Sequence, residues 1–319
     1  MRIPVRRLVK DAVVASLAAA RVDRLCARIR AKRDEVLVLN LHRVTPESNP
    51  FWPPVTPEAF RSLASFVRTN CDTVLFCELA EARSDRRPLV VLSFDDGFRD
   101  FVEYAMPILD EYGLVANQNV IGSAVRTGEP PFAVAVADAL HAAGEQRVRE
   151  LRIDGFAERL GPSTLDRTRF GVQLTNYLKD LAPPAREHVW GPIGDLLGEI
   201  PSRTPMMTVS DISEAAGAGH HIGCHSYSHE SMEHLSDAAV EHDLDLCDAF
   251  FRDQGLTTDV FALPNGSHRP DQIAPLQRRG YRHVLTIGRP ATARAGVHPR
   301  SAIYGDSAAE LRLRAVVGV

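Results

Sequence analysis

Short hydrophobic runs alternate with longer amphipathic segments along most of the chain. The runs are rich in leucine or β-branched residues, which is typical of strands, and the segments between them are long enough for helices. Because the runs are apolar at nearly every position, we expect parallel strands buried on both faces. The expected strands are residues 36–42, 73–76, 89–94, 116–121, 221–225, 260–263 and 283–287. This order of elements predicts an α/β protein built from βα units.

Two helix starts carry capping signals. Thr56 precedes Pro57, which is the order expected for an N-cap followed by the first helical residue. Ser236, with Glu241 on a following turn, marks a second start.

Strand signals disappear between about residues 123 and 205. Helical patterns at 134–143 and 170–181 replace them, with turns at 161–162 and 183–184. We interpret this stretch as a helical insertion that lies over one rim of the fold, where loops shape a substrate cleft. A purely stabilising role is the alternative.

The N-terminus combines positive charge with apolar residues. The first ten residues include four Lys or Arg, and residues 12–20 are small or apolar. This pattern predicts a basic amphipathic helix that packs on the body or contacts an anionic membrane surface. It also weakly resembles a signal peptide that ends before Arg21, although Asp11 and the shortness of the run argue against export. No stretch approaches the roughly 18 apolar residues of a spanning helix.

Charge and cysteine content narrow the function. The 319 residues contain 37 Lys or Arg and 41 Asp or Glu, for a net charge of -4. The chain therefore has no excess of positive charge for binding nucleic acid. Its five cysteines are scattered and form no CxxC pair, so neither a disulfide framework nor a thiolate zinc site is indicated. We expect a reducing compartment, the cytoplasm, with membrane-peripheral attachment and export left open.

A buried strand ends in two adjacent carboxylates at residues 93–97, which read Ser-Phe-Asp-Asp-Gly. Side chains at the carboxyl ends of strands point into the mouth of an α/β fold. Two carboxylates this close repel each other unless a cation or a proton intervenes, so Asp95 and Asp96 suggest a metal ligand beside a base. An ordinary Asp-Asp-Gly turn is the alternative.

Histidines follow a second strand. Residues 219–229 contain four of them, and His225 and His229 are spaced to converge on one ion from a strand end and the next turn. Two imidazoles and one carboxylate leave coordination positions open for water and substrate, which is typical of a catalytic metal site. A solvated histidine-rich surface is the alternative.

These two motifs resemble those of the polysaccharide deacetylases, the carbohydrate esterase family four enzymes with a NodB homology domain. Residues 93–97 resemble their first motif and residues 225–229 their second, in the family's order. The resemblance implies that Asp95 is the general base and that Asp96 and the two histidines hold a divalent metal, zinc or else cobalt or nickel. It also implies a distorted (β/α) barrel, here with a helical insertion, and an N-acetylated glycan as substrate.

Residues 39–42 (Leu-Asn-Leu-His) resemble the family's late leucine–histidine motif, whose histidine is the general acid, but here they precede the Asp-Asp strand. This order is similar to the circularly permuted branch that includes the poly-N-acetylglucosamine deacetylases. The first and last strands of a closed barrel are neighbours, so a motif moved between chain ends keeps its place in space. The resemblance implies His42 as the acid; His298, or a structural role for His42, are the alternatives.

Residues 261–266 (Phe-Ala-Leu-Pro-Asn-Gly) correspond to the third motif, where many members carry an arginine and an aromatic residue. Both are missing here. Our hypothesis is that Arg300, from a later strand, orients Asp95 by a charge-assisted hydrogen bond. The remaining substrate-contact candidates are Pro264, Asn265 and Gly266.

We therefore predict three segments: an N-terminal helix at 1–34, a deacetylase barrel at 35–305 interrupted at about 123–205, and a tail at 306–319. In the implied mechanism the metal activates a water, Asp95 accepts its proton and His42 protonates the departing amine. A backbone N–H near Asn265 or Gly266 would stabilise the oxyanion. Two alternatives stay open, a phosphoesterase or other metallohydrolase on the same scaffold and a catalytically weak glycan-binding protein.

Overall fold

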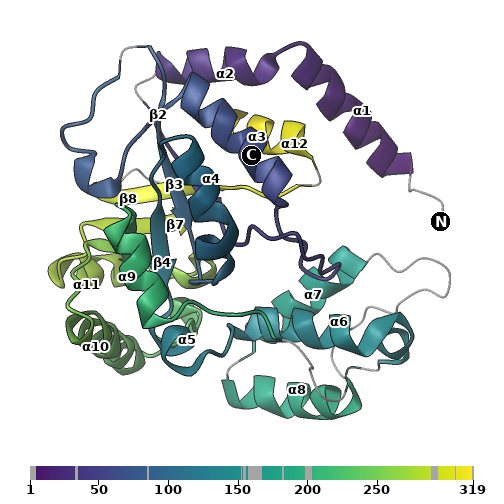
Figure 1. The fold of residues 1–319 in the computed structure, drawn as a ribbon. Coiled ribbons are helices and arrows are strands. Elements are labelled where there is room, and N and C mark those ends of the chain that lie inside the picture. The colour runs from purple at the N-terminus through teal and green to yellow at the C-terminus, as the bar shows by residue number, and fades with distance from the viewer. Residues whose placement is uncertain are drawn as a thin grey trace.

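Parallel strands close into a barrel at the centre of the computed structural model, with helices around them (Figure 1). The structure describes residues 5–32, 35–84, 86–151, 153, 156, 167–181, 183–197, 203–288, 294–305 and 307–317. The strands are β1 (Val36–Leu41), β2 (Asp72–Thr73), β3 (Leu89–Phe94), β4 (Asn117–Val120), β5 (His221–Cys224), β6 (Val260–Ala262), β7 (His283–Ile287) and β8 (Val297–Ala302).

The barrel runs in the order β1, β8, β7, β6, β5, β4, β3 and closes where β3 pairs with β1, while β2 adds to the outer side of β3. All of these pairings are parallel. The first strand therefore lies between the last strand and the Asp-Asp strand. This confirms the predicted (β/α) barrel. It also confirms that the first and last strands of the barrel are neighbours.

Alternate residues of each strand face different cores. On β3, Val90 and Leu92 pack outward against the helices, whereas Val91 points into the barrel with Val38 and Leu285. The strand is apolar at nearly every position because both of its faces are buried. Further along the same inward face, the residues become polar: Asn40, Ser93 and Asn119 are all buried. The barrel is thus apolar at one end and polar at the end where the strands finish.

The helices cover the outside of the barrel and build the insertion. They are α1 (Val5–Ala19), α2 (Val22–Ala31), α3 (Pro57–Asn70), α4 (Met106–Glu111), α5 (Gly122–Thr127), α6 (Phe132–Glu150), α7 (Arg167–Lys179), α8 (Pro183–Leu197), α9 (Val209–Gly217), α10 (Asp237–Asp253), α11 (Ile273–Arg278) and α12 (Ala308–Val317). Short helical turns are η1 (Phe76–Glu78), η2 (Phe101–Ala105), η3 (Met232–His234), η4 (Pro264–Gly266) and η5 (Pro270–Gln272). Thr56 and Ser236 cap α3 and α10 as predicted.

Two strand predictions need correction. The run at 73–76 is a strand only at Asp72–Thr73, because Phe76 turns away in η1 to plug the apolar end of the barrel. Strand β8 was not among the runs expected from hydrophobicity. Its sequence is mostly polar and includes Pro299, since it carries His298 and Arg300 into the barrel.

The insertion consists of α6, α7 and α8, which share a hydrophobic core of their own that includes Leu140, Phe170 and Leu174. Figure 1 shows these helices together beside the carboxyl end of the barrel. The turn predicted at 161–162 lies outside the described residues, and the one at 183–184 begins α8. The helical nature of this stretch is confirmed.

The N-terminal segment forms two helices where one was predicted, because Arg21 between them adopts a left-handed conformation with φ of 55°. The segment predicted as a C-terminal tail contains α12, which packs on α2 and α3. Among the described residues, no helix is long and apolar enough to cross a membrane. The domain boundaries themselves stay predictions.

Candidate metal and catalytic site

Four strand ends bring the predicted site residues to one rim of the barrel. Because the strands are parallel, β1, β3, β5 and β6 all finish there, and each is followed by a polar residue or turn. A cleft of about 550 Å³ opens at this rim. Its lining includes His42, Asp95, Asp96, His225, His229 and Asn265.

Asp96, His225 and His229 form a group that could hold a metal ion, with one ligand atom from each lying within 4.8 Å of the others. Asp96 Oδ1 is 3.3 Å from Nε2 of each histidine. His225 Nδ1 bonds the Ala262 carbonyl at 2.8 Å, which fixes that nitrogen as the donor and leaves Nε2 with a free lone pair facing the group. A backbone carbonyl behind the ring is a usual partner of a metal-binding histidine. The donor set therefore fits a divalent ion.

The electrostatics of this group favour a charged carboxylate. Burial would raise the pKa of Asp96, but the neighbouring imidazoles of His225 and His229 outweigh it and hold the pKa well below its usual range. Burial lowers the pKa of His229, with Asp96 opposing the shift. For His225, burial also acts to lower the pKa, but the nearby carboxylates of Asp95 and Asp96 together outweigh it and raise the pKa. An anionic carboxylate with a neutral imidazole is the protonation state that binds metal.

Backbone strain is concentrated at the rim. Of the five described non-glycine residues with positive φ, Asp96, His229 and Asn265 line the cleft and Ser226 directly follows His225. Such conformations are costly and persist where surrounding contacts hold them. One such contact comes from α10, where the buried Asp243 carboxylate accepts hydrogen bonds from the backbone N–H groups of Tyr227 and Ser228, at 3.0 and 2.9 Å. These bonds fix the turn that presents both histidines.

Asp95 is held by Arg300. Nη1 of Arg300 lies 2.8 Å from both carboxylate oxygens of Asp95, and both side chains are almost fully buried. The same nitrogen donates to Asn40 Oδ1 at 2.9 Å. Burial would raise the pKa of Asp95, but the Arg300 guanidinium, aided by His225 and His42, lowers it. The structure thus brings Arg300 into the contact with Asp95 that the sequence hypothesis requires.

Asn119 is a further partner of Asp95 that the sequence reasoning missed. Its Nδ2 donates to Asp95 Oδ1 at 2.7 Å and to Ser93 Oγ at 3.0 Å. Gly223, opposite it on β5, makes room: a Cβ there would lie 2.1 Å from Asn119 Oδ1. The run of polar residues 117–119 in an otherwise apolar strand was the signal available in the sequence.

His42 follows β1 and lines the cleft beside the two aspartates. The β1–β3 register pairs Leu41 with Phe94, which puts His42 level with Asp95. Its ring packs edge-on against Trp52 at 5.9 Å. Burial lowers the pKa of His42, although the charges of Asp96 and Asp95 oppose the shift.

The alternative acid, His298, lies elsewhere. Its Nε2 is 3.0 Å from His283 Nδ1, and its ring contacts Phe76 in the apolar end of the barrel. Burial, together with His283, lowers the pKa of His298 to about 4. The structure therefore does not bring His298 to the cleft.

The third-motif turn contributes one side chain to the cleft. Asn265 lines it, whereas Pro264 is buried behind it and Gly266 packs against Ile287. The Gly266 N–H donates to the Leu263 carbonyl at 2.9 Å, so it does not serve as an oxyanion donor. The expectation for Gly266 is wrong, and the N–H of Asn265 is the remaining candidate at this turn.

The insertion supplies Lys179, which the sequence reasoning also missed. This last residue of α7 lines the cleft, and its Nζ lies 2.5 Å from Asn265 Oδ1. A single lysine at the end of a helix carries no signal of its own in the sequence.

The chain is a (β/α)-barrel protein with an Asp-His-His group and a second, arginine-held aspartate at the carboxyl rim of the barrel. Residues 173–284 match the family model described as polysaccharide deacetylase. That range includes His225 and His229 but not Asp95, so the family match and the first motif are separate observations. The resemblance to the polysaccharide deacetylases is confirmed. No curated protein matches the chain.

Solved structures share the fold. The Streptococcus pyogenes deacetylase PplD in complex with acetate is 16% identical, with a TM-score of 0.56 over 86% of this chain and 96% of that one. IcaB from Ammonifex degensii is 18% identical, with a TM-score of 0.54 over 88% and 97%. A de-N-acetylase from Aggregatibacter actinomycetemcomitans is 15% identical, with a TM-score of 0.52 over 83% and 93%. At these identities the likeness establishes the barrel, and with the family match it supports a carbohydrate deacetylase.

Proposed function

We propose that this protein is a metal-dependent hydrolase that removes N-acetyl groups from an amino-sugar glycan or glycoconjugate and releases acetate. The observation that carries the proposal is the pairing of two aspartates with different surroundings. Asp96 faces His225 and His229, as a metal ligand would, while Asp95 faces Arg300 and Asn119 and keeps its carboxylate beside the cleft.

The residues divide the chemistry between them. Asp96, His225 and His229 would hold the ion, with zinc our first choice and cobalt or nickel as alternatives. When bound, such an ion polarises the acetamide carbonyl and lowers the pKa of a bound water. Asp95 would accept a proton from the attacking water as the water oxygen adds to the acetyl carbon. Arg300 keeps Asp95 ionised and in place for this task.

His42 completes the cycle from the end of the neighbouring strand, β1. Protonation of the amide nitrogen by the His42 imidazolium lets the carbon–nitrogen bond break, which leaves acetate and a free amine. The lowered pKa of His42 makes its imidazolium a stronger acid, so it gives up this proton readily. Exchange with solvent then returns both groups to their starting states.

Acetate release tests the proposal. The purified protein, loaded with zinc, is incubated with N-acetylglucosamine oligomers, and acetate is measured with and without a chelator. We expect release that the chelator abolishes. Release of phosphate from phosphoesters instead would favour the alternative hydrolase, and tight binding of oligosaccharide without turnover would favour a glycan-binding protein.

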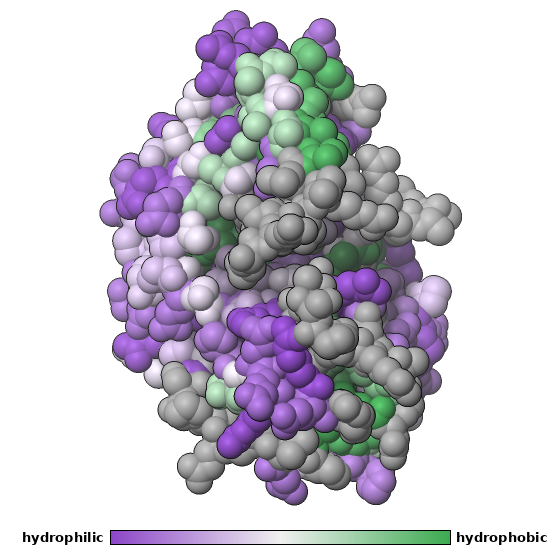
Figure 2. Space-filling model, turned by 90° about the vertical axis from the view of Figure 1, so that its right-hand side faces the viewer, coloured by the Kyte–Doolittle hydropathy of each residue, from purple (hydrophilic) through white to green (hydrophobic). Residues whose placement is uncertain are grey.

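We also propose that α1 and α2 attach the protein to an anionic membrane surface, so that a lipid-linked sugar is within reach. Residues 5–32 contain eight Lys or Arg and two Asp, although the whole chain has a net charge of -4. Several large apolar side chains of the two helices are exposed: Val9, Val13, Leu17, Leu25 and Ile29. Figure 2 shows hydrophobic side chains at the top of that face, where Figure 1 places α1. Exposed apolar residues beside basic ones are typical of interfacial helices.

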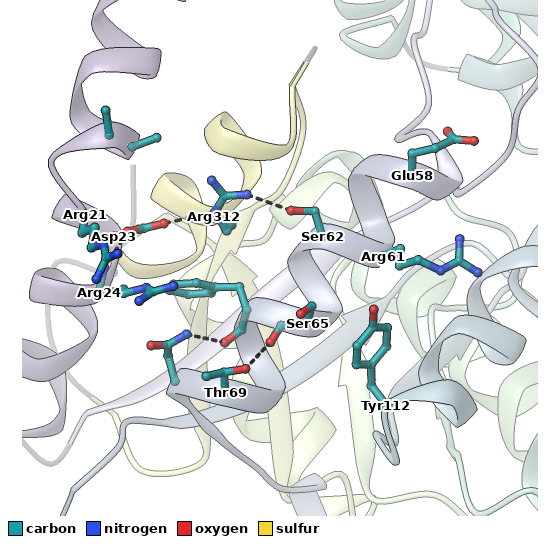
Figure 3. A pocket seen from close by; sticks show the side chains of 14 residues that line it. Arg21, Asp23, Arg24, Glu58, Arg61, Ser62, Ser65, Thr69, Tyr112 and Arg312 are labelled. Atoms are coloured by element: carbon teal, nitrogen blue, oxygen red, sulfur yellow. Dashed lines mark hydrogen bonds and ion pairs between the residues drawn. The ribbon is translucent and has the colours of Figure 1, made fainter.

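A groove beside these helices adds positive charge. Figure 3 shows it between α2 and α3, with Arg21, Arg24, Arg61 and Arg312 around it. Arg312 is paired with Asp23 at 3.1 Å and Arg61 with Glu111 at 3.0 Å. No described residue forms a hydrogen bond or ion pair with the guanidinium groups of Arg21 and Arg24. Both are therefore available to lipid phosphates.

Vesicle sedimentation tests the attachment. We expect the protein to bind vesicles that contain phosphatidylglycerol more tightly than vesicles of phosphatidylcholine alone. The double variant Val13→Asp/Leu17→Asp should lose this binding, whereas Val209→Asp, a change at another exposed valine, should keep it. Equal binding by all three proteins would contradict the proposal. A concentration-dependent dimer that is lost only in Val13→Asp/Leu17→Asp would also contradict it, because the exposed apolar side chains would then serve dimerisation.

A further inference from the structure

We propose that Lys179 is a catalytic residue that binds the acetyl oxygen of the substrate, on which negative charge develops during hydrolysis. This inference rests on the proposed function. It assigns to the helical insertion a direct part in the reaction, in place of a merely stabilising one.

Lys179 is the single Lys or Arg among the residues recorded as lining the cleft. It ends α7 and reaches from the insertion across to the third-motif turn. Arg300 is buried below the floor and is engaged with Asp95, so it does not offer a charge to the cleft. Among the described lining residues, a Lys or Arg side chain that contacts bound substrate therefore comes from Lys179.

The ammonium group is held in a defined position. Its Nζ lies 2.5 Å from Asn265 Oδ1, and Asn265 Nδ2 in turn donates to Ser231 Oγ at 3.0 Å. Asn265 adopts a left-handed backbone with φ of 56°, which is a strained conformation for a residue other than glycine. These contacts fix an otherwise flexible side chain, which is how a site residue is pre-organised.

Lys179 also lies close enough to the metal-binding group to interact with it. Burial lowers the pKa of Lys179, while the charge of Asp96 opposes this shift. The charge of Lys179 also helps to lower the pKa of His229, after the larger contributions of burial and of the His225 charge. The ammonium group thus lines the same cleft as Asp96 and His229.

An ammonium group has three N–H donors, and Asn265 accepts one of them. No other described side chain is recorded as an acceptor for Lys179. Donors on a partly buried charge are costly unless they are paired, so the remaining two need oxygen partners in the cleft. An oxygen that gains negative charge in the transition state is stabilised more strongly than a neutral one.

Two variants separate this role from a structural one. Lys179→Met removes the charge and keeps most of the side-chain volume. Asn265→Ala removes the contact that holds the lysine but leaves the ammonium in place. If Lys179 served only to fasten the insertion to the barrel, both changes would have the same effect.

Acetate affinity and turnover are measured on the zinc-loaded proteins. We expect Lys179→Met to bind acetate at least about tenfold more weakly and to lose about 100-fold in kcat, the size typical of removing one oxyanion donor. Asn265→Ala should show a smaller loss than Lys179→Met in both measurements, because the ammonium group remains but is held less firmly, and Lys179→Arg should recover part of the loss.

The two readouts distinguish this inference from the proposed function. If the wild type releases no acetate yet binds it in a way that depends on Lys179, the proposed function fails and Lys179 remains an anion-binding residue. Acetate affinity that does not change in Lys179→Met, or equal losses in Lys179→Met and Asn265→Ala, would overturn the inference.

Discussion

Arg300 holds Asp95 from a position 205 residues further along the chain, with Nη1 equidistant at 2.8 Å from the two carboxylate oxygens. The pairing depends on barrel closure, since β8 carries the arginine, β3 leads to the aspartate, and β1 lies between them. The last strand of the barrel therefore supplies the positive charge that holds this aspartate.

Arg300→Met should shift the pH dependence of activity. Burial raises the pKa of Asp95 and the Arg300 guanidinium lowers it, so the pKa rises when the guanidinium is removed. The base then becomes protonated at a higher pH. We expect the acidic limb of the kcat/KM profile to move to higher pH, with a loss of about 100-fold at neutral pH. Arg300→Lys should show a smaller shift. An unchanged acidic limb would rule out Arg300 as the residue that tunes Asp95.

The same substitution should destabilise the fold. Removing one member of a buried ion pair leaves an uncompensated charge and costs about 3 kcal/mol or more in the free energy of unfolding. Chemical denaturation of Arg300→Met at pH 7 measures this, and the more exposed pair Arg61–Glu111 provides a control. Arg61→Met should cost less than about 1 kcal/mol.

Asp95→Asn should abolish turnover and retain metal. The amide keeps the shape of the side chain but does not accept a proton, and Asp95 is not part of the Asp96–His225–His229 group. We expect a loss of about 1,000-fold in kcat, within the range for a general base. Metal content by elemental analysis should equal that of the wild type. Near-normal activity would show that another residue is the base.

His225→Ala should lose metal and activity together. It removes one of three ligand atoms and the ring that the Ala262 carbonyl orients. We expect metal affinity to fall at least about 100-fold. His221→Ala is the matched control, because His221 lies on the same strand but bonds Asn117 at 2.7 Å and is outside the group. Retention of full metal affinity by His225→Ala would contradict the assignment.

The two histidines proposed as the acid should behave differently. His42→Gln should lower kcat about 100-fold with metal retained, since His42 lines the cleft. His298→Gln should leave kcat within about threefold of the wild type, because that ring pairs with His283 away from the cleft. The reverse result would make His298 the acid.

The resemblance of residues 39–42 to the family's late motif, together with barrel closure, predicted that His42 shares a rim with Asp95. Both follow apolar strands, and a closed barrel makes β1 and β3 neighbours, so the permuted position of the histidine could be recognised. The metal-binding group could be found because its members cluster in two short motifs. Each motif places carboxylates or histidines directly after a buried strand, which is typical of a metal or catalytic site.

Other parts of the site depend on contacts that no local pattern encodes. Asn119 reaches Asp95 because Gly223 leaves space on the next strand, and Lys179 reaches Asn265 because α7 ends over the rim. Strand β8 escaped prediction since its inward residues are polar. These features depend on tertiary packing, whereas hydrophobic periodicity reports only which faces are buried.

The most direct test of the central claim is acetate release from N-acetylglucosamine oligomers and lipid-linked N-acetyl sugars, with zinc or cobalt added and a chelator as control. We predict release that requires metal, is lost in Asp95→Asn and His225→Ala, and is greatest for one substrate of the panel. Metal-loaded wild-type protein that releases no acetate from any of them would contradict the proposed function.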